Sequence, residues 1–104
     1  MNGSREILAL IKDTVTQTEP GASVILYGSY ARNDNNEDSD IDLIVLVNKD
    51  TLTVNDKDRI IYPLYKLGIK TDTIISPIVY TKNAWAHHRI TPFYENVNRE
   101  GRLL

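Results

Sequence analysis

Apolar residues in the first half of the chain follow two periods, one typical of helices and one typical of buried strands. Between residues 4 and 17 they recur at helical spacing, which predicts an amphipathic helix with Ser4 as its N-cap. Residues 23–27 and 41–47 form two nearly continuous Val, Ile and Leu runs. Runs of this length and composition are typical of strands buried in a sheet.

The second half alternates in the same way. In chain order we expect a short helix over 29–33, a polar loop over 33–39, a helix over 56–67, a strand over 70–80, a helix over 83–89, and a last helix starting at Thr91-Pro92 and ending before Gly101. Pro63 indicates a kink in the helix over 56–67 or a late start of it, and Gly68 indicates the end of that helix. Pro77 indicates that the strand over 70–80 lies at an edge or contains a bulge. Tyr65 is expected to face the core. This order predicts one α/β (α+β) domain over residues 1–104, a small mixed sheet flanked by helices.

Composition narrows the class of protein. Twelve Lys plus Arg against fourteen Asp plus Glu give a net charge of -2, so the broad positive field of a nucleic-acid-binding protein is not expected. The absence of Cys excludes disulfides and thiolate metal sites. No apolar run approaches membrane-spanning length and no signal core is visible, so we expect a cytosolic protein.

Two acids stand at the start of the second apolar run. Side chains alternate across a strand, so Asp40 and Asp42 are expected on one face, with Cα atoms roughly 6.5 Å apart. Such a pair repels and loses solvation beside buried residues, and a divalent cation relieves both penalties. Carboxylate oxygens suit Mg²⁺ or Mn²⁺, which also takes ligands from substrate phosphates and water.

Gly28-Ser29 follows the first apolar run and offers the complementary chemistry. Gly28 lacks a Cβ, so phosphate oxygens could approach its backbone, and Ser29 presents a hydroxyl and an N–H at the start of a helix. If the two predicted strands are neighbours, the phosphate turn and the metal pair share one end of the sheet. Tyr27 and Tyr30 flank this turn, where stacking on a base and packing in the core are both open.

Asp72 is the acid of the third strand-like segment. Held near Asp40, it would bind a second metal or accept the proton of an attacking hydroxyl. Lys70 nearby offers the alternative of an ordinary ion pair. Arg32 also has two readings, a phosphate contact or a packing residue paired with a loop acid.

A family resemblance rests on these residues. Gly28-Ser29, ten residues and then Asp40-x-Asp42, with an apolar strand on either side, resembles the core motif of the polymerase-beta-type nucleotidyltransferases. Trp85 and the segment 91–101 are similar to the minimal nucleotidyltransferases, or MNT proteins. The resemblance implies the nucleotidyltransferase fold, Mg²⁺ on Asp40, Asp42 and Asp72, and nucleotide phosphates on Gly28 and Ser29.

The resemblance also implies an activity and a partner. MNT proteins often act as antitoxins that transfer AMP from ATP to a tyrosine of a helical HEPN-type toxin. The acceptor would be recognised by another chain or by a second copy of this one. Two alternatives stay open: a non-catalytic module that neutralises a partner by occlusion, and a small-molecule nucleotidyltransferase of the aminoglycoside-modifying kind, which normally has an added helical domain.

Three further patterns have weaker claims. The family often has Gly where this chain has Asn33, and Asn is expected to keep the same left-handed turn. The loop pattern Asp34-x-Asn36-x-Asp38 mimics the start of an EF-hand, but Ser and Val stand where Gly and Glu are required, so a solvated turn is expected. His87 and His88 are adjacent and diverge on a helix, which favours structural roles.

Overall fold

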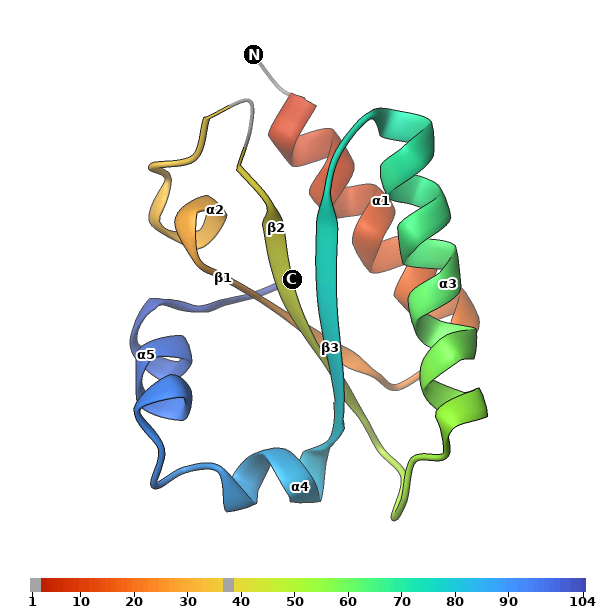
Figure 1. Cartoon of the computed structure of the whole chain (residues 1–104), viewed down its shortest axis with the longest axis vertical. Helices are drawn as coiled ribbons and strands as arrows, with labels where there is room; N and C mark the ends of the chain where they lie inside the picture. Colours follow the sequence, from red (N-terminus) through yellow and green to blue (C-terminus); the bar gives the residue numbers. More distant parts are fainter. Residues whose placement is uncertain (1–2, 37–38) are drawn as a thin grey trace.

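The computed structural model describes residues 3–36 and 39–104, and in that part the chain forms a four-stranded sheet with helices on both faces (Figure 1). The helices are α1 (Gly3–Thr18), α2 (Ser29–Arg32), α3 (Val54–Thr71), α4 (Lys82–His87) and α5 (Pro92–Glu100), and the strands are β1 (Ser23–Tyr27), β2 (Ile41–Val47), β3 (Ile75–Thr81) and β4 (Arg102–Leu103). The predicted fold class is confirmed. Glu37 and Asp38, which belong to the predicted polar loop, lie outside the described residues. No helix of the described part has both the length and the apolar character to cross a bilayer.

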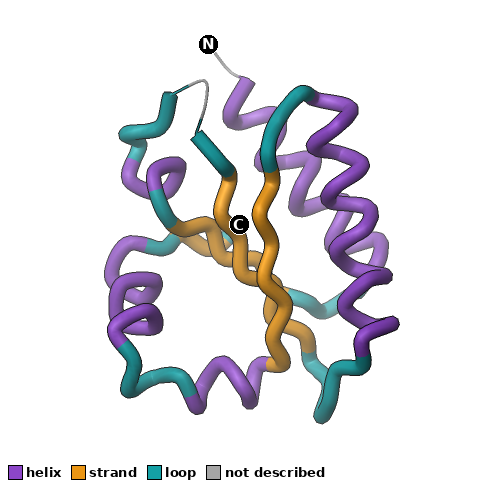
Figure 2. Tube along the Cα trace, viewed as in Figure 1, coloured by secondary structure: helices purple, strands orange, loops and turns teal. Residues whose placement is uncertain are grey.

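The sheet has the strand order β3-β2-β1-β4. β1 runs antiparallel to β2 and β4, whereas β2 and β3 are parallel and are joined by the crossover helix α3. Figure 2 shows the strands crossing the centre of the molecule, with helices on either side. β1 and β2 have the bounds that the apolar runs predicted.

β3 lies at one edge of the sheet, as Pro77 indicated. The carbonyl of Ile74 accepts a hydrogen bond from the Ile41 N–H at 2.9 Å, so the backbone groups of every second residue from Ile74 face β2. Pro77 falls on the alternate set and faces outward, where its missing N–H costs the sheet no hydrogen bond. β3 begins at Ile75, so the prediction that the strand starts at residue 70 is wrong.

Helix α3 is longer than its apolar pattern predicted. It starts with a capping box, in which the Thr53 hydroxyl accepts from the Asp56 N–H and the Asp56 carboxylate accepts from the Thr53 N–H. The helix then continues through Pro63 without ending. The two reciprocal bonds stabilise the first turn, which lies ahead of the expected start at residue 56.

The end of α3 differs most from expectation. The prediction that Gly68 ends the helix is wrong, because the helix continues to Thr71 and Asp72 terminates it in the left-handed conformation, with φ 55°. Gly68 instead permits close packing: a Cβ at this position would lie 2.6 Å from the carbonyl oxygen of Thr73. The chain can therefore turn back directly over the last helical turn and enter β3.

The remaining helix ends are close to their predicted positions. α1 starts at Gly3, so Ser4 lies inside the helix. α4 spans residues 82–87, one residue earlier at its start and two residues earlier at its end than the expected 83–89. α5 has the predicted punctuation: the Thr91 hydroxyl accepts from the Tyr94 N–H, Pro92 is the first helical residue, and Gly101 follows the last.

Each face of the sheet has its own apolar cluster. Helices α1 and α3 cover one face, where the buried cluster includes Ile11, Leu26, Leu43, Val45, Ile60 and Leu64. Helices α4 and α5 cover the other face with Ile44, Trp85 and Val97, joined by Tyr27, Tyr80 and Phe93. The prediction that Tyr65 faces the core is wrong, because its side chain faces outward and the residue is 51% exposed.

The close packing at the end of α3 leads to a stability prediction. Replacing Gly68→Ala should lower the free energy of unfolding by about 1–3 kcal/mol, because the added methyl collides with a backbone carbonyl that cannot move easily. Helix propensity alone predicts the opposite, a gain of up to about 1 kcal/mol. Urea denaturation measures the difference, with the exposed Lys70→Ala in the same turn as control. A stabilised Gly68→Ala protein would contradict the packing role.

Candidate active site

The Gly-Ser turn connects β1 to the short helix α2. Gly28 has φ 75° and ψ -155°, a backbone conformation open almost only to glycine. Its carbonyl accepts from the N–H groups of Ala31 and Arg32, which closes α2 after a single turn. Asn33 then ends the helix in the left-handed conformation with φ 62°, as predicted.

Strand pairing brings this turn to the acidic pair. In the antiparallel register, Tyr27 lies opposite Asp42, and the parallel register of β3 places Ser76 on the other side of Asp42. Gly28 directly follows Tyr27, and Asp40 lies two residues before Asp42. The expectation that Gly28-Ser29 and the acids Asp40 and Asp42 share one end of the sheet is therefore confirmed.

The contact between the two halves of the motif is direct. A Cβ added to Gly28 would lie 2.6 Å from Oδ2 of Asp42, so the carboxylate occupies the space that any other residue's side chain would need. Glycine at this position thus serves two purposes, the positive φ of the turn and room for the acid. We call this close approach of Gly28 and the Asp42 carboxylate the glycine cradle. It places backbone N–H groups of the turn next to carboxylate oxygens.

Asp42 is the acid of the pair whose ionised form is disfavoured by its surroundings. Partial burial raises the pKa of the Asp42 carboxyl, and the nearby charge of Asp40 raises it further. Burial also raises the pKa of the Tyr27 phenol, with added contributions from Asp42 and Tyr80. Asp40 itself is exposed and precedes the first residue of β2.

The two carboxylates fit a hard divalent cation. They would provide oxygen ligands next to Gly28, and Mg²⁺ is commonly bound by one or two protein carboxylates with phosphates and water completing the shell. Ser29 adds a hydroxyl and a backbone N–H beside them. With four residues, α2 is too short to carry the large macrodipole expected at the start of a long helix.

The sequence predicts that Asp72 lies on a strand near Asp40, and the structure does not place it on that strand. It is the exposed C-cap of α3 rather than a residue of β3, and the β3 residue beside Asp42 is Ser76. Within residues 3–36 and 39–104, no group of three or more His, Asp or Glu side chains is placed to hold a metal ion. The strand-like pattern of residues 70–80 predicts Asp72 on a strand, whereas α3 extends to Thr71 and β3 begins only at Ile75.

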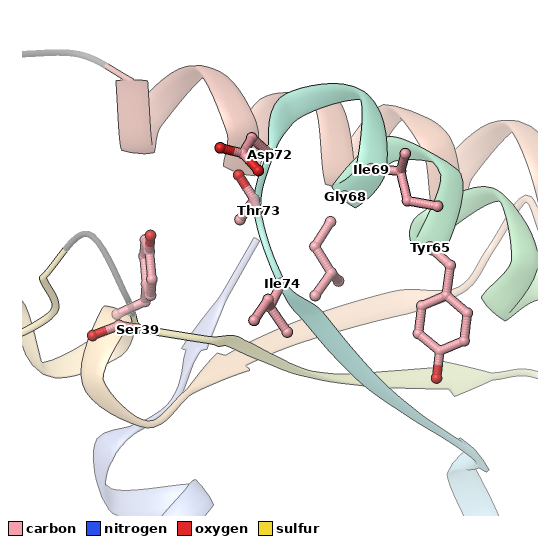
Figure 3. Close-up of a pocket in the computed structure, with 9 residues that line it drawn as sticks. Ser39, Tyr65, Gly68, Ile69, Asp72, Thr73 and Ile74 are labelled. Carbon is pink, nitrogen blue, oxygen red and sulfur yellow. The ribbon is translucent and has the colours of Figure 1, made fainter.

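Asp72 instead lines a cavity of about 920 Å³ next to the site (Figure 3). The cavity extends from Ser39, beside Asp40, across Ile74 to Tyr65 and Ile69 of α3. Its lining includes no member of the carboxylate pair. It is a neighbouring hollow that sequence patterns did not reveal, because residues far apart in the chain form it.

Arg32 has a structural partner on each side. Its Nε lies 3.0 Å from Oδ2 of Asp34, and its Nη1 lies 3.4 Å from Oε2 of Glu100 at the end of α5. The Asp34 hydrogen bond and charge, with smaller contributions from Glu100, raise the pKa of the guanidinium. The pairing with a loop acid agrees with the packing alternative, and the guanidinium ties α2 to α5.

The aromatic residues near the site pack against each other. The rings of Tyr27 and Phe93 meet edge to face with centroids 5.5 Å apart, and His88 contacts the rings of Tyr80 and Trp85 at 5.0 and 6.0 Å. These contacts put Tyr27 in the aromatic cluster while its strand neighbour is Asp42. Tyr27 therefore lies beside Asp42, and its packing against Phe93 is sufficient to explain its position.

Comparisons with known proteins show the family of this chain. Residues 8–96 match a family model described as the nucleotidyltransferase domain. Two proteins of Methanocaldococcus jannaschii, both provisionally named protein adenylyltransferases, are similar: one is 40% identical over 78 residues, covering 75% of this chain and 72% of the relative. The other is 36% identical over 81 residues, covering 78% of this chain and 75% of the relative. A crystal structure of a toxin–antitoxin with AMP-PNP shares the fold, with a TM-score of 0.58, 21% identity, and coverage of 96% of this chain and 70% of that chain.

The glycine cradle leads to a prediction about metal binding. Gly28→Ala should lose about 1–3 kcal/mol of stability from the forced backbone conformation, and should weaken Mn²⁺ binding in the presence of an ATP analogue by at least about tenfold, because the methyl displaces the Asp42 carboxylate. Titration calorimetry measures the Mn²⁺ affinity of this variant and of a control. Gly21→Ala is the matched control: it also has a positive φ, 90°, but no atom lies within 4 Å of the added Cβ. Equal losses of Mn²⁺ affinity in both variants would contradict the cradle.

A second prediction concerns the pH dependence of stability. The pKa of Asp42 is raised in the folded protein, so the folded state holds this proton more tightly than the unfolded state. Without divalent cations, the associated stability is fully present below the unfolded pKa and is lost as pH rises through the folded pKa. Asp42→Asn should remove this loss and be the more stable protein at neutral pH. Denaturation curves of both proteins across acidic and neutral pH test this, and parallel pH profiles would refute it.

Proposed function

Since this chain belongs to the nucleotidyltransferase domain family, we propose that it transfers AMP from ATP to a hydroxyl group of a partner protein. The family makes it a transferase of nucleotidyl groups. The choice of AMP and of a protein acceptor is supported by the names of the two M. jannaschii relatives. The structural observation that supports it most is the Asp42 carboxylate lying against the bare Cα of Gly28.

Each residue of the site has a proposed part in the reaction. Asp40 and Asp42 would hold Mg²⁺, which would neutralise charge on the triphosphate and on the leaving pyrophosphate. Ser29 would donate its hydroxyl and backbone N–H to phosphate oxygens, and Gly28 leaves room for the Asp42 carboxylate beside them. Tyr27 and Phe93 form an aromatic wall beside Asp42.

The transfer itself needs mainly position. The acceptor oxygen attacks the α-phosphorus in line, the bond to the β-phosphate oxygen breaks, and pyrophosphate leaves while the hydroxyl proton passes to water. Asp72 has no part in the proposed metal pair, because the end of α3 places it in the neighbouring cavity. Holding the reactants in this geometry is the main contribution available to so small a site.

A helical HEPN-type toxin is the partner that we propose. The MNT resemblance suggests it, and the fold neighbour is a toxin–antitoxin structure with AMP-PNP. The cytosolic location stays a prediction from the sequence. A non-catalytic antitoxin that binds without transfer is the competing function, favoured by Ser76 standing where β3 could have supplied a third acid.

Transfer of label tests the proposal. The chain is incubated with Mg²⁺, ATP labelled on its α-phosphate and a HEPN-type protein from the same genome, and label on the protein is measured over time. Asp40→Asn should lower the rate by on the order of 100-fold, because removing one charged group that stabilises the transition state has effects of this size. Asp50→Asn, an exposed acid beyond the other end of β2, is the control and should keep the rate.

Three results would contradict the proposal. Tight binding of the partner without any transfer supports the non-catalytic module, and label on an added aminoglycoside instead of the protein supports the small-molecule class. Undiminished transfer by Asp40→Asn would remove the carboxylate pair from the mechanism.

A further inference from the structure

Helix α3 has a second apolar face that the core does not use. Its inner face buries Ile60 and Leu64 against the sheet. Its outer face carries Tyr62, Tyr65 and Ile69, which are 63%, 51% and 83% exposed and follow the helical spacing of three and four residues. A surface helix normally presents polar residues on that side, so this outer face requires an explanation.

The outer face opens into the cavity beside the active site. Tyr65 and Ile69 line the cavity together with Ile74, which is 62% exposed where the chain enters β3. Figure 3 shows these three side chains on one side of the hollow and Ser39 on the other. We call the hollow lined by Ser39, Tyr65, Ile69, Asp72 and Ile74 the α3–β3 groove.

The charge of the groove is negative. Asp72 is the one charged residue among those that line it, and within residues 3–36 and 39–104 its carboxylate has neither an ion pair nor a side-chain hydrogen bond. It stands at the C-terminal end of the 18-residue helix α3, where the backbone dipole is also negative. A complementary occupant therefore combines apolar groups with a cationic group.

The groove also lies next to both halves of the catalytic motif. Its lining residue Ser39 directly precedes Asp40, and its lining residue Tyr30 directly follows Ser29. The groove is therefore bordered by the chain neighbours of both motif halves, while Gly28, Ser29, Asp40 and Asp42 themselves do not line it.

We infer that the α3–β3 groove docks the acceptor segment of a partner protein, a stretch that carries apolar side chains next to a lysine or arginine. The apolar side chains cover Tyr65, Ile69 and Ile74, and the cation pairs with Asp72. Docking itself is independent of the reaction; only the delivery of the hydroxyl to Asp40 rests on the proposed function.

Binding of defined peptides tests the docking. The isotope-labelled full chain is titrated with a synthetic amphipathic peptide of leucine, alanine and arginine with one tyrosine, and with the same peptide carrying glutamate for arginine. We expect amide NMR shifts concentrated at residues 65–75 and a dissociation constant at least about tenfold lower for the arginine peptide. Ile69→Glu should weaken that binding by at least about tenfold, while Ile90→Glu, equally exposed at 88% between α4 and α5, should not.

Further measurements separate the possible failures. Binding of an ATP analogue with Mn²⁺ should be the same in Ile69→Glu and in the unaltered chain, which also verifies folding. Shifts that centre elsewhere, no preference for arginine, no binding, or equal weakening by Ile90→Glu would each overturn the docking site. A dimer in sedimentation experiments that Ile69→Glu dissociates would show that a second copy occupies the groove instead. Peptide binding without nucleotidyl transfer would defeat the proposed function alone.

Discussion

The carboxylate of Asp42 occupies the space that a side chain at residue 28 would need, and this contact constrains how the Gly28-Ser29 turn meets the acidic end of β2. It exists because β1 and β2 are antiparallel neighbours whose register sets Tyr27 opposite Asp42. A shift of the register by one residue would turn Asp42 toward α1 and α3 and bring a buried apolar side chain to the glycine. The hydrophobic alternation of β2 therefore secures the geometry of its polar end.

This arrangement trades stability for chemistry. Asp42 sits two residues from Ile44, whose side chain is fully buried, and beside the like charge of Asp40. Both conditions disfavour its ionised form. A bound cation reverses the balance, since a ligand that binds only the folded state adds to its stability. The domain thus carries a local electrostatic cost that its substrate complex offsets, a pattern expected where a charged site is built into a small sheet.

Sequence patterns were most informative where local and tertiary preferences agree. The runs 23–27 and 41–47 are short, continuous and bounded by turn residues, and the structure has the same bounds. The sequence patterns were wrong about the end of α3, because tertiary packing determines where that helix stops. The pattern predicts a helix end at Gly68, but the glycine instead leaves room for the carbonyl oxygen of Thr73, and Asp72 ends the helix in the left-handed conformation.

The misplacement of Asp72 on a strand followed from that single error. Tyr65 illustrates a different limit. A helix with two apolar faces does not reveal, from spacing alone, which face packs on the sheet. The hollow between α3 and Ser39 is formed by residues remote in sequence, so no local pattern could have announced it.

The topology of the sheet also has a consequence for how the site assembles. Both halves of the motif lie on one hairpin-like unit, β1-α2-β2, whose strands are close in sequence, whereas β3 joins only after the long crossover through α3. Closing a short loop costs less chain entropy than closing a long one, and contacts of low sequence separation form faster. The pairing of β1 with β2 therefore closes a shorter loop than the pairing of β2 with β3, and changes in the length of the loop before Ser39 impose only a small, slowly growing entropic penalty on it.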